Sequence, residues 1–286
     1  MKRLIVNADD LGADEARNAG IFEAVEAGAV TAVSILVNGP AFQDALRWIA
    51  AAKCPSLSIG IHLNLTEGRP LTPGLAGLTD SNGGFPGKAE AHRRLRVGGG
   101  PDLEEAIWRE FSAQVAALRD AGIRVDHLDG HQHIHIFPAA IEATVRTAEE
   151  FGIPWIRVPE EPSPVFADAA GPFNAGEAEM FSRLASATRG RIRRSALRMT
   201  DHFRGLYLKG RLSPENIEET LSALPSGLTE LMVHPGRASA ESASGPFSAF
   251  SNQDREKELE TLTSGGFQGM LARHGCRLTS HAKEVS

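Results

Sequence analysis

Short apolar runs alternate with amphipathic stretches along the whole chain. The apolar runs have the length and composition of buried β-strands, and they occupy residues 4–6, 32–37, 57–65, 125–128, 155–158 and 231–233, with a short final strand at Leu278. The stretches between them predict helices at residues 14–26, 41–52, 102–121, 138–151 and 254–275, the last interrupted at Gly265 and Gly266. This alternation predicts βα units around a mostly parallel sheet. The fold class is therefore α/β, and the strands suit a distorted or incomplete (β/α) barrel better than an ideal eightfold one.

Two segments interrupt the alternation. They are residues 67–100, which are rich in glycine and proline, and residues 159–210. Loops of this length inside a compact domain usually form lids or binding walls, so we predict loop insertions in both places. No linker separates two halves of the chain, and we expect a single domain over residues 1–286.

Composition narrows the classes of function. The formal net charge of −6 gives no basic surface for nucleic acid. The two cysteines, Cys54 and Cys276, are far apart in sequence, which excludes a disulfide framework and a cysteine zinc site. No apolar run approaches the roughly 18 residues of a membrane-spanning helix, so we expect a cytoplasmic protein without stable membrane insertion.

Chemically competent side chains follow three of the predicted strands. Asp9 and Asp10 come just after the first strand, His62 lies on the third, and His131, His133 and His135 follow the fourth. The carboxyl ends of parallel strands meet at one rim, so these segments can share a crevice. Carboxylate and imidazole together are the ligand chemistry of a divalent metal site.

The two adjacent aspartates suggest two different roles. In an extended strand neighbouring side chains point to opposite faces, so one can bind metal while the other accepts a proton. A polar turn that caps the next helix is the alternative interpretation. His62 shares its strand face with Asn64 and Thr66, and a polar face on a buried strand must meet something wet or charged.

The histidine cluster is open to two geometries. All three imidazoles share a face if the segment is extended, whereas His131 and His135 share one if it is helical. Either way we expect two or three imidazoles to converge, and a surface histidine tract is the alternative. Asp129 is placed to orient one of these rings from behind.

Two further residues lie where strands end. Arg157 can neutralise Asp9, hold a substrate or form a surface salt bridge. His234 is a candidate general acid, because histidine titrates near neutral pH. The chain has no phosphate-binding loop and no nucleophile elbow, which leaves the metal site as its best catalytic candidate.

These motifs resemble the YdjC-like carbohydrate deacetylase family. The matching pieces span most of the chain in order, and they are Asn7-Ala8-Asp9-Asp10-Leu11-Gly12, Asn18-Ala19-Gly20-Ile21, Gly60-Ile61-His62-Leu63, Leu128 to His135, and His234-Pro235-Gly236. The family often has phenylalanine where Leu11 stands, a departure that concerns packing. The resemblance implies a distorted barrel related to the NodB-type polysaccharide deacetylases.

The resemblance also implies an activity and a set of roles. The reaction is removal of an acetyl group from an N-acetylated sugar, such as a chitooligosaccharide or another N-acetylglucosamine glycan or glycolipid. Some relatives act on the sugar of hopanoid lipids, and the sequence decides neither for nor against that subgroup. Asp10, His62 and His131 correspond to metal ligands, Asp9 to the base and His234 to the acid. The other expected site residues bind substrate or support the ligands from behind, and they are Asn64, Asp129, His135 and Arg157.

One divalent ion, Mg or Zn, is the expected cofactor, and a homodimer is a family-level expectation. The residues leave two alternatives open, a metal-dependent phosphoesterase and a metal- or sugar-binding protein without turnover.

Overall fold

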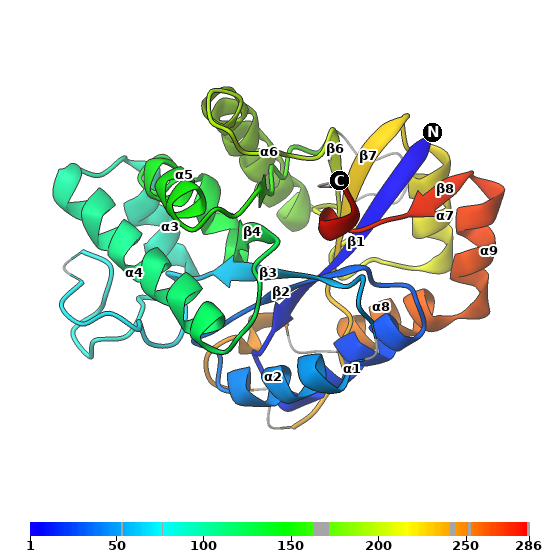
Figure 1. Ribbon diagram of the computed structural model, residues 1–286, viewed down its shortest axis with the longest axis horizontal. Helices are drawn as coiled ribbons and strands as arrows, with labels where there is room; N and C mark the ends of the chain where they lie inside the picture. Colours follow the sequence, from blue (N-terminus) through cyan, green and yellow to red (C-terminus); the bar gives the residue numbers. More distant parts are fainter. Residues whose placement is uncertain (53, 76, 163–171, 241–243, 251–252, 285–286) are drawn as a thin grey trace.

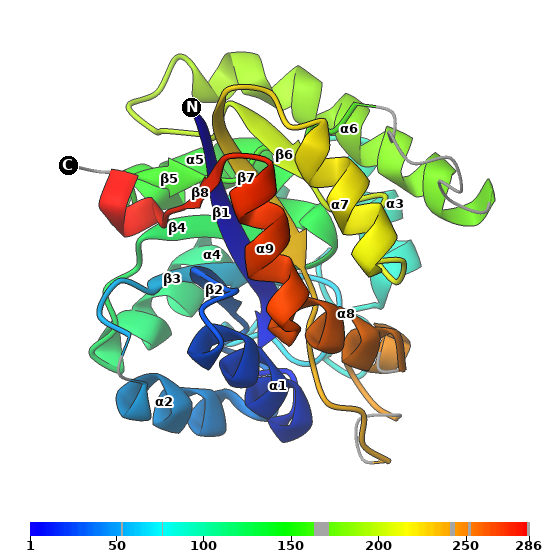
Figure 2. The same cartoon turned by 90° about the vertical axis from the view of Figure 1, so that its right-hand side faces the viewer.

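Parallel strands form the centre of the molecule, and helices surround them (Figures 1 and 2). The computed structural model describes residues 1–52, 54–75, 77–162, 172–240, 244–250 and 253–284. The strands are β1 (Lys2–Leu11), β2 (Ala32–Ile35), β3 (Ser58–Leu63), β4 (His127–Gly130), β5 (Trp155–Ile156), β6 (His202–Arg204), β7 (Gly227–Val233) and β8 (Cys276–Leu278). The helices are α1 (Glu15–Glu26), α2 (Phe42–Ala51), α3 (Lys88–Arg96), α4 (Pro101–Asp120), α5 (Ile141–Glu150), α6 (Pro172–Ile192), α7 (Pro214–Ser222), α8 (Gln253–Thr263) and α9 (Gly265–Arg273).

The sheet curves into an incomplete barrel, as predicted from the sequence. Its strands follow the order β5-β4-β3-β2-β1-β7-β6, and all pairings are parallel. The two ends of this path approach each other through one bridge between Trp155 and Arg198, just before β6. One edge of β1 is shared, because β8 pairs with Lys2–Leu4 and β2 pairs further along, up to Leu11. This division of one edge between two strands distorts the barrel.

Side-chain alternation along β1 divides the interior into an apolar and a polar layer. Leu4, Val6 and Ala8 join the large core that packs under the helices. The other face begins with Ile5, which forms a small cluster with Ala32, Trp155 and Leu228. The next residues on that face, Asn7 and Asp9, are buried and polar. The barrel interior therefore becomes charged toward the carboxyl ends of its strands.

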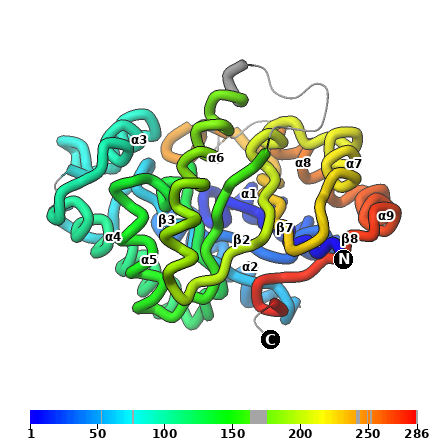
Figure 3. Tube along the Cα trace, turned by 90° about the horizontal axis from the view of Figure 1, so that it is seen from above, coloured from blue at the N-terminus to red at the C-terminus, as the bar shows by residue number. Residues whose placement is uncertain are grey.

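The two segments predicted as loop insertions contain regular structure, so that part of the prediction is wrong. Residues 67–100 include α3, and residues 159–210 include α6 and β6. The sequence of α3, KAEAHRRLR, buries only three side chains, Ala91, His92 and Leu95, so its apolar pattern is weak. Viewed from above, α3, α4 and α5 lie on one side of the strands and α7, α8 and α9 on the other (Figure 3).

The first strand is also longer than predicted. It continues beyond Asn7 to Leu11 and so includes both aspartates. Across the described residues, no helix is both long and apolar enough to cross a membrane.

Candidate active site

A cavity of about 320 Å³ opens at the carboxyl ends of the strands. Asp9 and Asp10 reach it from β1, His62 from β3, and His131 from the turn that follows β4. His234 reaches it from just beyond β7. Helix α6 and the segment before α8 supply aromatic walls, with Phe181, Phe247 and Phe250.

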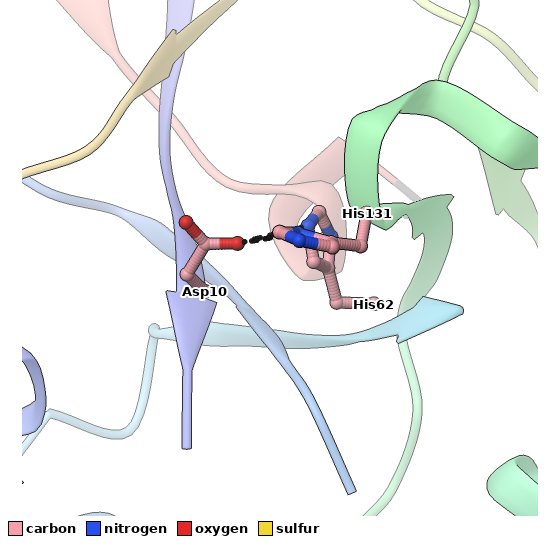
Figure 4. A group of neighbouring side chains, drawn as sticks. All are labelled: Asp10, His62 and His131. Atoms are coloured by element: carbon pink, nitrogen blue, oxygen red, sulfur yellow. Dashed lines mark hydrogen bonds and ion pairs between the residues drawn. The ribbon is translucent and has the colours of Figure 1, made fainter. Parts of the chain in front are cut away.

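Asp10, His62 and His131 lie together in this cavity, as the sequence predicted (Figure 4). The Nδ1 atom of His131 is 2.8 Å from Oδ1 of Asp10, and Nε2 of His62 is 3.4 Å from the same oxygen. One ligand atom from each residue fits within 4.8 Å of the other two. The donor set of one carboxylate and two imidazoles fits a divalent cation and leaves room for further ligands.

A backbone irregularity brings both aspartates to one cavity. Asp10 has a φ of 67°, in the left-handed region, and the pairing register of β1 with β2 shifts between Ala8 and Leu11. A bulge of this kind re-aims a side chain relative to the regular alternation of a strand. Asp9 and Asp10 therefore both line the cavity, although their partners differ.

Buried charges surround Asp10. Its Oδ2 atom accepts a hydrogen bond from Arg255 of α8. Burial would raise the pKa of Asp10, but His131 and Arg255 outweigh it and hold the pKa well below the ordinary value. Asp10 is thus an anion with one oxygen on a guanidinium and the other facing the two imidazoles.

His62 and His131 each have one ring nitrogen near Asp10, and in both rings the other nitrogen contacts a second carboxylate. The register of β3 and β4 places His62 beside Asp129, and the Nδ1 atom of His62 donates to Oδ1 of Asp129 at 2.7 Å. Nε2 of His131 donates to Glu67 at 2.9 Å. Burial opposes a charge on His62, yet Asp129 and Asp9 raise its pKa to about 10.

Arg157 forms the centre of the polar layer inside the barrel. Two of its nitrogens donate to the two oxygens of Asp9, both at 2.7 Å, and its Nε donates to Glu230 at 2.7 Å. Asp129 lies 2.8 Å from the same guanidinium. Arg157 is only 3% exposed, so it neutralises Asp9 from within the protein and does not form a surface salt bridge.

Asp9, His62 and Asp129 form a second group with metal-ligand spacing. A cation is already present there, because the guanidinium of Arg157 contacts both carboxylates. Asp129 also accepts the His62 proton on Nδ1. The group around Asp10 is therefore the better candidate metal centre.

His234 borders the cavity with a free ring nitrogen. Its Nδ1 atom is buried and has no hydrogen-bond partner among the described residues. Burial is the main cause that holds the pKa of His234 well below its ordinary value, and Lys209 and Arg255 add to it. The resting ring is therefore neutral, which runs against a resting imidazolium as the acid.

The other two histidines of the cluster do not converge on the metal-ligand group, contrary to our expectation. Gln132 and His133 have positive φ values of 52° and 57°, so the segment is neither extended nor a regular helix. His133 lines the cavity and packs against Phe181, with ring centroids 4.6 Å apart. His135 donates from Nε2 to the backbone oxygen of Arg157, and so supports that residue from behind.

Asn64 contributes to the site indirectly. Its side chain accepts from the backbone N–H groups of Thr66 and Glu67 and donates to the backbone oxygen of Glu67 at 2.7 Å. It therefore shapes the turn after β3 and does not line the cavity.

The chain matches a known protein family over nearly its whole length. The model of the YdjC-like protein family matches residues 3–273. The chain belongs to the YdjC-like family.

Relatives of this YdjC-like chain carry a consistent name. A carbohydrate deacetylase of Homo sapiens is 34% identical, and the alignment covers 96% of this chain and 89% of that protein. A carbohydrate deacetylase of Vibrio cholerae is 29% identical, and the alignment covers 99% of this chain and 97% of that protein. Among solved structures, a protein of Enterococcus faecalis V583 that has been suggested to cleave cellobiose phosphate aligns with a TM-score of 0.77 at 24% identity, over 98% of both chains. That likeness shows a shared fold.

Several charged residues of the site in this YdjC-like chain escaped the sequence analysis. They are Glu67, Lys209, Glu230 and Arg255. Glu67 had a usable signal, because it follows the polar strand end of His62 and Asn64. Arg255 had none, because it lies in the charge-rich helix QDREKELETLT, whose composition is that of a solvated face.

Proposed function

We propose that this YdjC-like chain is a metal-dependent carbohydrate deacetylase that hydrolyses the acetamide of an N-acetylated sugar. The observation that carries the proposal is the meeting of Asp10 with His62 and His131 beside a second carboxylate, Asp9, that has separate partners. The names of the relatives support the same reaction. Amide hydrolysis by water requires activation of the carbonyl and removal of a proton from the attacking water. Asp10 would serve the first task by binding the metal, and Asp9 the second by accepting the proton.

Asp10, His62 and His131 would hold one divalent ion, with zinc or magnesium as the candidates. When bound, such an ion polarises an amide carbonyl and lowers the pKa of a coordinated water toward about 7. Asp129 accepts the Nδ1 proton of His62, so Nε2 is the nitrogen that faces Asp10 and that would bind the ion after releasing the proton that the raised pKa keeps on the free ring.

Asp9 is suited to take the proton from the attacking water. Its two oxygens accept from Arg157 and Asn7, but a carboxylate has about four acceptor positions, so capacity remains on the cavity side. Arg157 fixes the plane of this carboxylate and compensates its charge. The geometry favours proton transfer at Asp9 while metal binding takes place at Asp10.

His234 is the residue we propose to deliver a proton to the departing amine. Its neutral ring must first receive a proton, because burial and the neighbouring cations disfavour a resting imidazolium. The proton that Asp9 takes from water is the available source across the same cavity. The products are acetate and a free amino sugar.

The cavity walls suit a single sugar unit. A volume of about 320 Å³ lies at the lower end of small-molecule sites. Phe181, Phe247 and Phe250 offer apolar faces, whereas Lys88 and Lys209 offer donors for hydroxyl groups. The sugar that carries the acetamide can be enclosed, and the rest of a longer substrate would extend outside.

Acetate release is the measurement that tests this function. We expect release from at least one of a panel of N-acetylated mono- and oligosaccharides, loss of release after chelation, and recovery when zinc or magnesium is returned. Turnover of phosphate esters without acetate release would instead favour a phosphoesterase. Tight sugar binding with no acetate in any metal form would favour a binding protein.

A further inference from the structure

The structure places a second carboxylate, Glu67, behind the metal-ligand group, on the far nitrogen of His131. We propose that Glu67 is a positioning residue that fixes His131 so that its Nδ1 atom faces the metal position. The inference rests on the proposed metal site, but it does not depend on which reaction the metal serves.

The contacts of the two imidazoles are the first argument. His131 has Asp10 2.8 Å from its Nδ1 atom and Glu67 2.9 Å from its Nε2 atom. His62 has the opposite arrangement, with a carboxylate behind Nδ1 and Asp10 near Nε2. Glu67 would keep the proton on Nε2 of His131 and Asp129 the proton on Nδ1 of His62, so an ion held by Asp10 would displace the proton from the other nitrogen of each ring. The two rings therefore present different nitrogen atoms to one centre.

The way Glu67 is held is the second argument. The side chain of Asn64 bonds both the N–H and the carbonyl of Glu67, at 3.3 and 2.7 Å. Asn64 is itself fixed, because its backbone N–H donates to Gln114 and its backbone oxygen accepts from the same side chain. The side chains of Asn64 and Gln114, both fully buried, thus anchor the turn that carries Glu67.

Glu67 also steadies the irregular backbone beside His131. The Glu67 carboxylate accepts from the side-chain amide of Gln132 at 3.2 Å. Gln132 is one of the two residues with left-handed backbone in this turn, a conformation that costs energy for residues other than glycine. One carboxylate therefore contacts both the ligand ring and the adjoining strained residue.

The first experiment measures metal affinity and needs no substrate. Zinc would be titrated into the unmodified protein, Glu67→Gln and Glu177→Gln in competition with a chromophoric chelator. Glu177 is a matched control, because its carboxylate lines the same cavity but pairs with Lys88 and does not contact His131. We expect zinc affinity to fall about 10- to 100-fold in Glu67→Gln and to stay within about twofold in Glu177→Gln.

The second experiment reads the ring nitrogens directly. Long-range ¹H–¹⁵N correlation spectra of the zinc-loaded unmodified protein should show His62 protonated on Nδ1 and His131 protonated on Nε2. This measurement requires no variant, so a folding defect in Glu67→Gln cannot obscure it.

The outcomes separate this inference from the proposed function. Unchanged zinc affinity in Glu67→Gln, or a His131 ring protonated on Nδ1, would overturn the role of Glu67 whatever the activity. A cobalt-loaded Glu67→Gln whose visible spectrum shows a changed coordination number would also overturn it, because Glu67 would then be a ligand. Weakened affinity with unchanged coordination supports it, even if no acetylated sugar is turned over. No zinc binding by the unmodified protein would overturn both proposals.

Discussion

Two neighbouring aspartates with different partners are the centre of the site at the scale of single residues. Asp9 is bound by Arg157, whereas Asp10 faces His62 and His131. The sequence predicted that the pair would divide its roles, because adjacent residues in a strand point apart. It could not predict the left-handed backbone of Asp10, which lets both carboxylates reach one cavity.

We expect Asp9→Asn and Asp10→Asn to fail in different ways. Asp9→Asn removes the proposed proton acceptor but none of the proposed ligands, so acetate release should fall by about 10² to 10⁴-fold with zinc affinity nearly unchanged. Asp10→Asn removes the proposed ligand carboxylate, so zinc affinity and acetate release should fall together. Zinc titration and acetate assays on the same samples check both. Full turnover by Asp9→Asn would remove Asp9 from the role of base.

The residues that sequence analysis missed share one physical property. Glu67, Glu230 and Arg255 act through partners far away in the chain, which a local pattern does not identify. Of the three, Glu67 had a local signal of its own, the polar strand end that precedes it. His62 and His131 were predicted because each lies at the end of a recognisable strand. The expected convergence of His133 failed because the turn after β4 is neither extended nor helical.

At the scale of elements, the loop that carries His234 is held between two helices. The N–H of Arg237 donates to Ala16 of α1, and the N–H of Gly236 donates to Arg255 of α8. Helix α1 comes this close because residue 20 is glycine. A Cβ atom at Gly20 would lie 2.6 Å from the Cα of Gly236.

Gly20→Ala should therefore destabilise the protein. The clash is with backbone atoms, which cannot rotate away, so we expect a loss of roughly 1–3 kcal/mol in the free energy of unfolding. Gly176→Ala in α6 is the matched control, because among the described residues no atom beyond its chain neighbours and its own helix backbone lies within 4 Å of the added Cβ. The control should be neutral or more stable by up to about 1 kcal/mol, as expected for alanine in a helix. Urea denaturation measures both, and equal stability of the two variants would contradict the packing argument.

Several elements were not predicted because their local signals are short or weak. Strand β6 has three residues, His202–Arg204, and is defined by its pairing with β7. Helix α7 did have a signal that was overlooked, with Ser213 as N-cap and Pro214 at the first turn. Elements that carry the site were predicted because strand and helix alternate clearly around them.

At the scale of the whole molecule, the barrel interior explains why the apolar pattern of the sequence predicted the parallel sheet but not the full length of its first strand. Alternating βα units require a parallel sheet, and that much follows from apolar periodicity. The charged upper layer of the barrel breaks the apolar pattern at Asn7 and Asp9, so the first strand seemed to end early. The polar residues that shortened the predicted strand are thus the ones that form the site.

Buried carboxyl groups should also give the whole molecule a pH-dependent stability, and Glu161 allows this to be isolated. Glu161 lies in the segment after β5, is 6% exposed, and accepts from the N–H of Leu206 at 2.6 Å, which ties that segment to the loop after β6. Burial raises its pKa to about 7. It lies outside the cavity of the candidate active site.

The Glu161 carboxyl holds its proton more tightly in the folded protein than in the unfolded chain, so its contribution to stability decreases as the pH rises. The contribution of Glu161 is fully present below its ordinary pKa of roughly 4.3 and is lost as the pH rises to about 7. The unfolding free energy of the unmodified protein minus that of Glu161→Gln should therefore fall by on the order of 3 kcal/mol between pH 4.5 and 7.5. Urea denaturation of both proteins at half-unit intervals measures this difference, and the difference cancels the titration of other groups. A difference that is flat or rises with pH would mean that Glu161 is ionised in the folded protein, with Arg204 or the backbone N–H groups outweighing its burial.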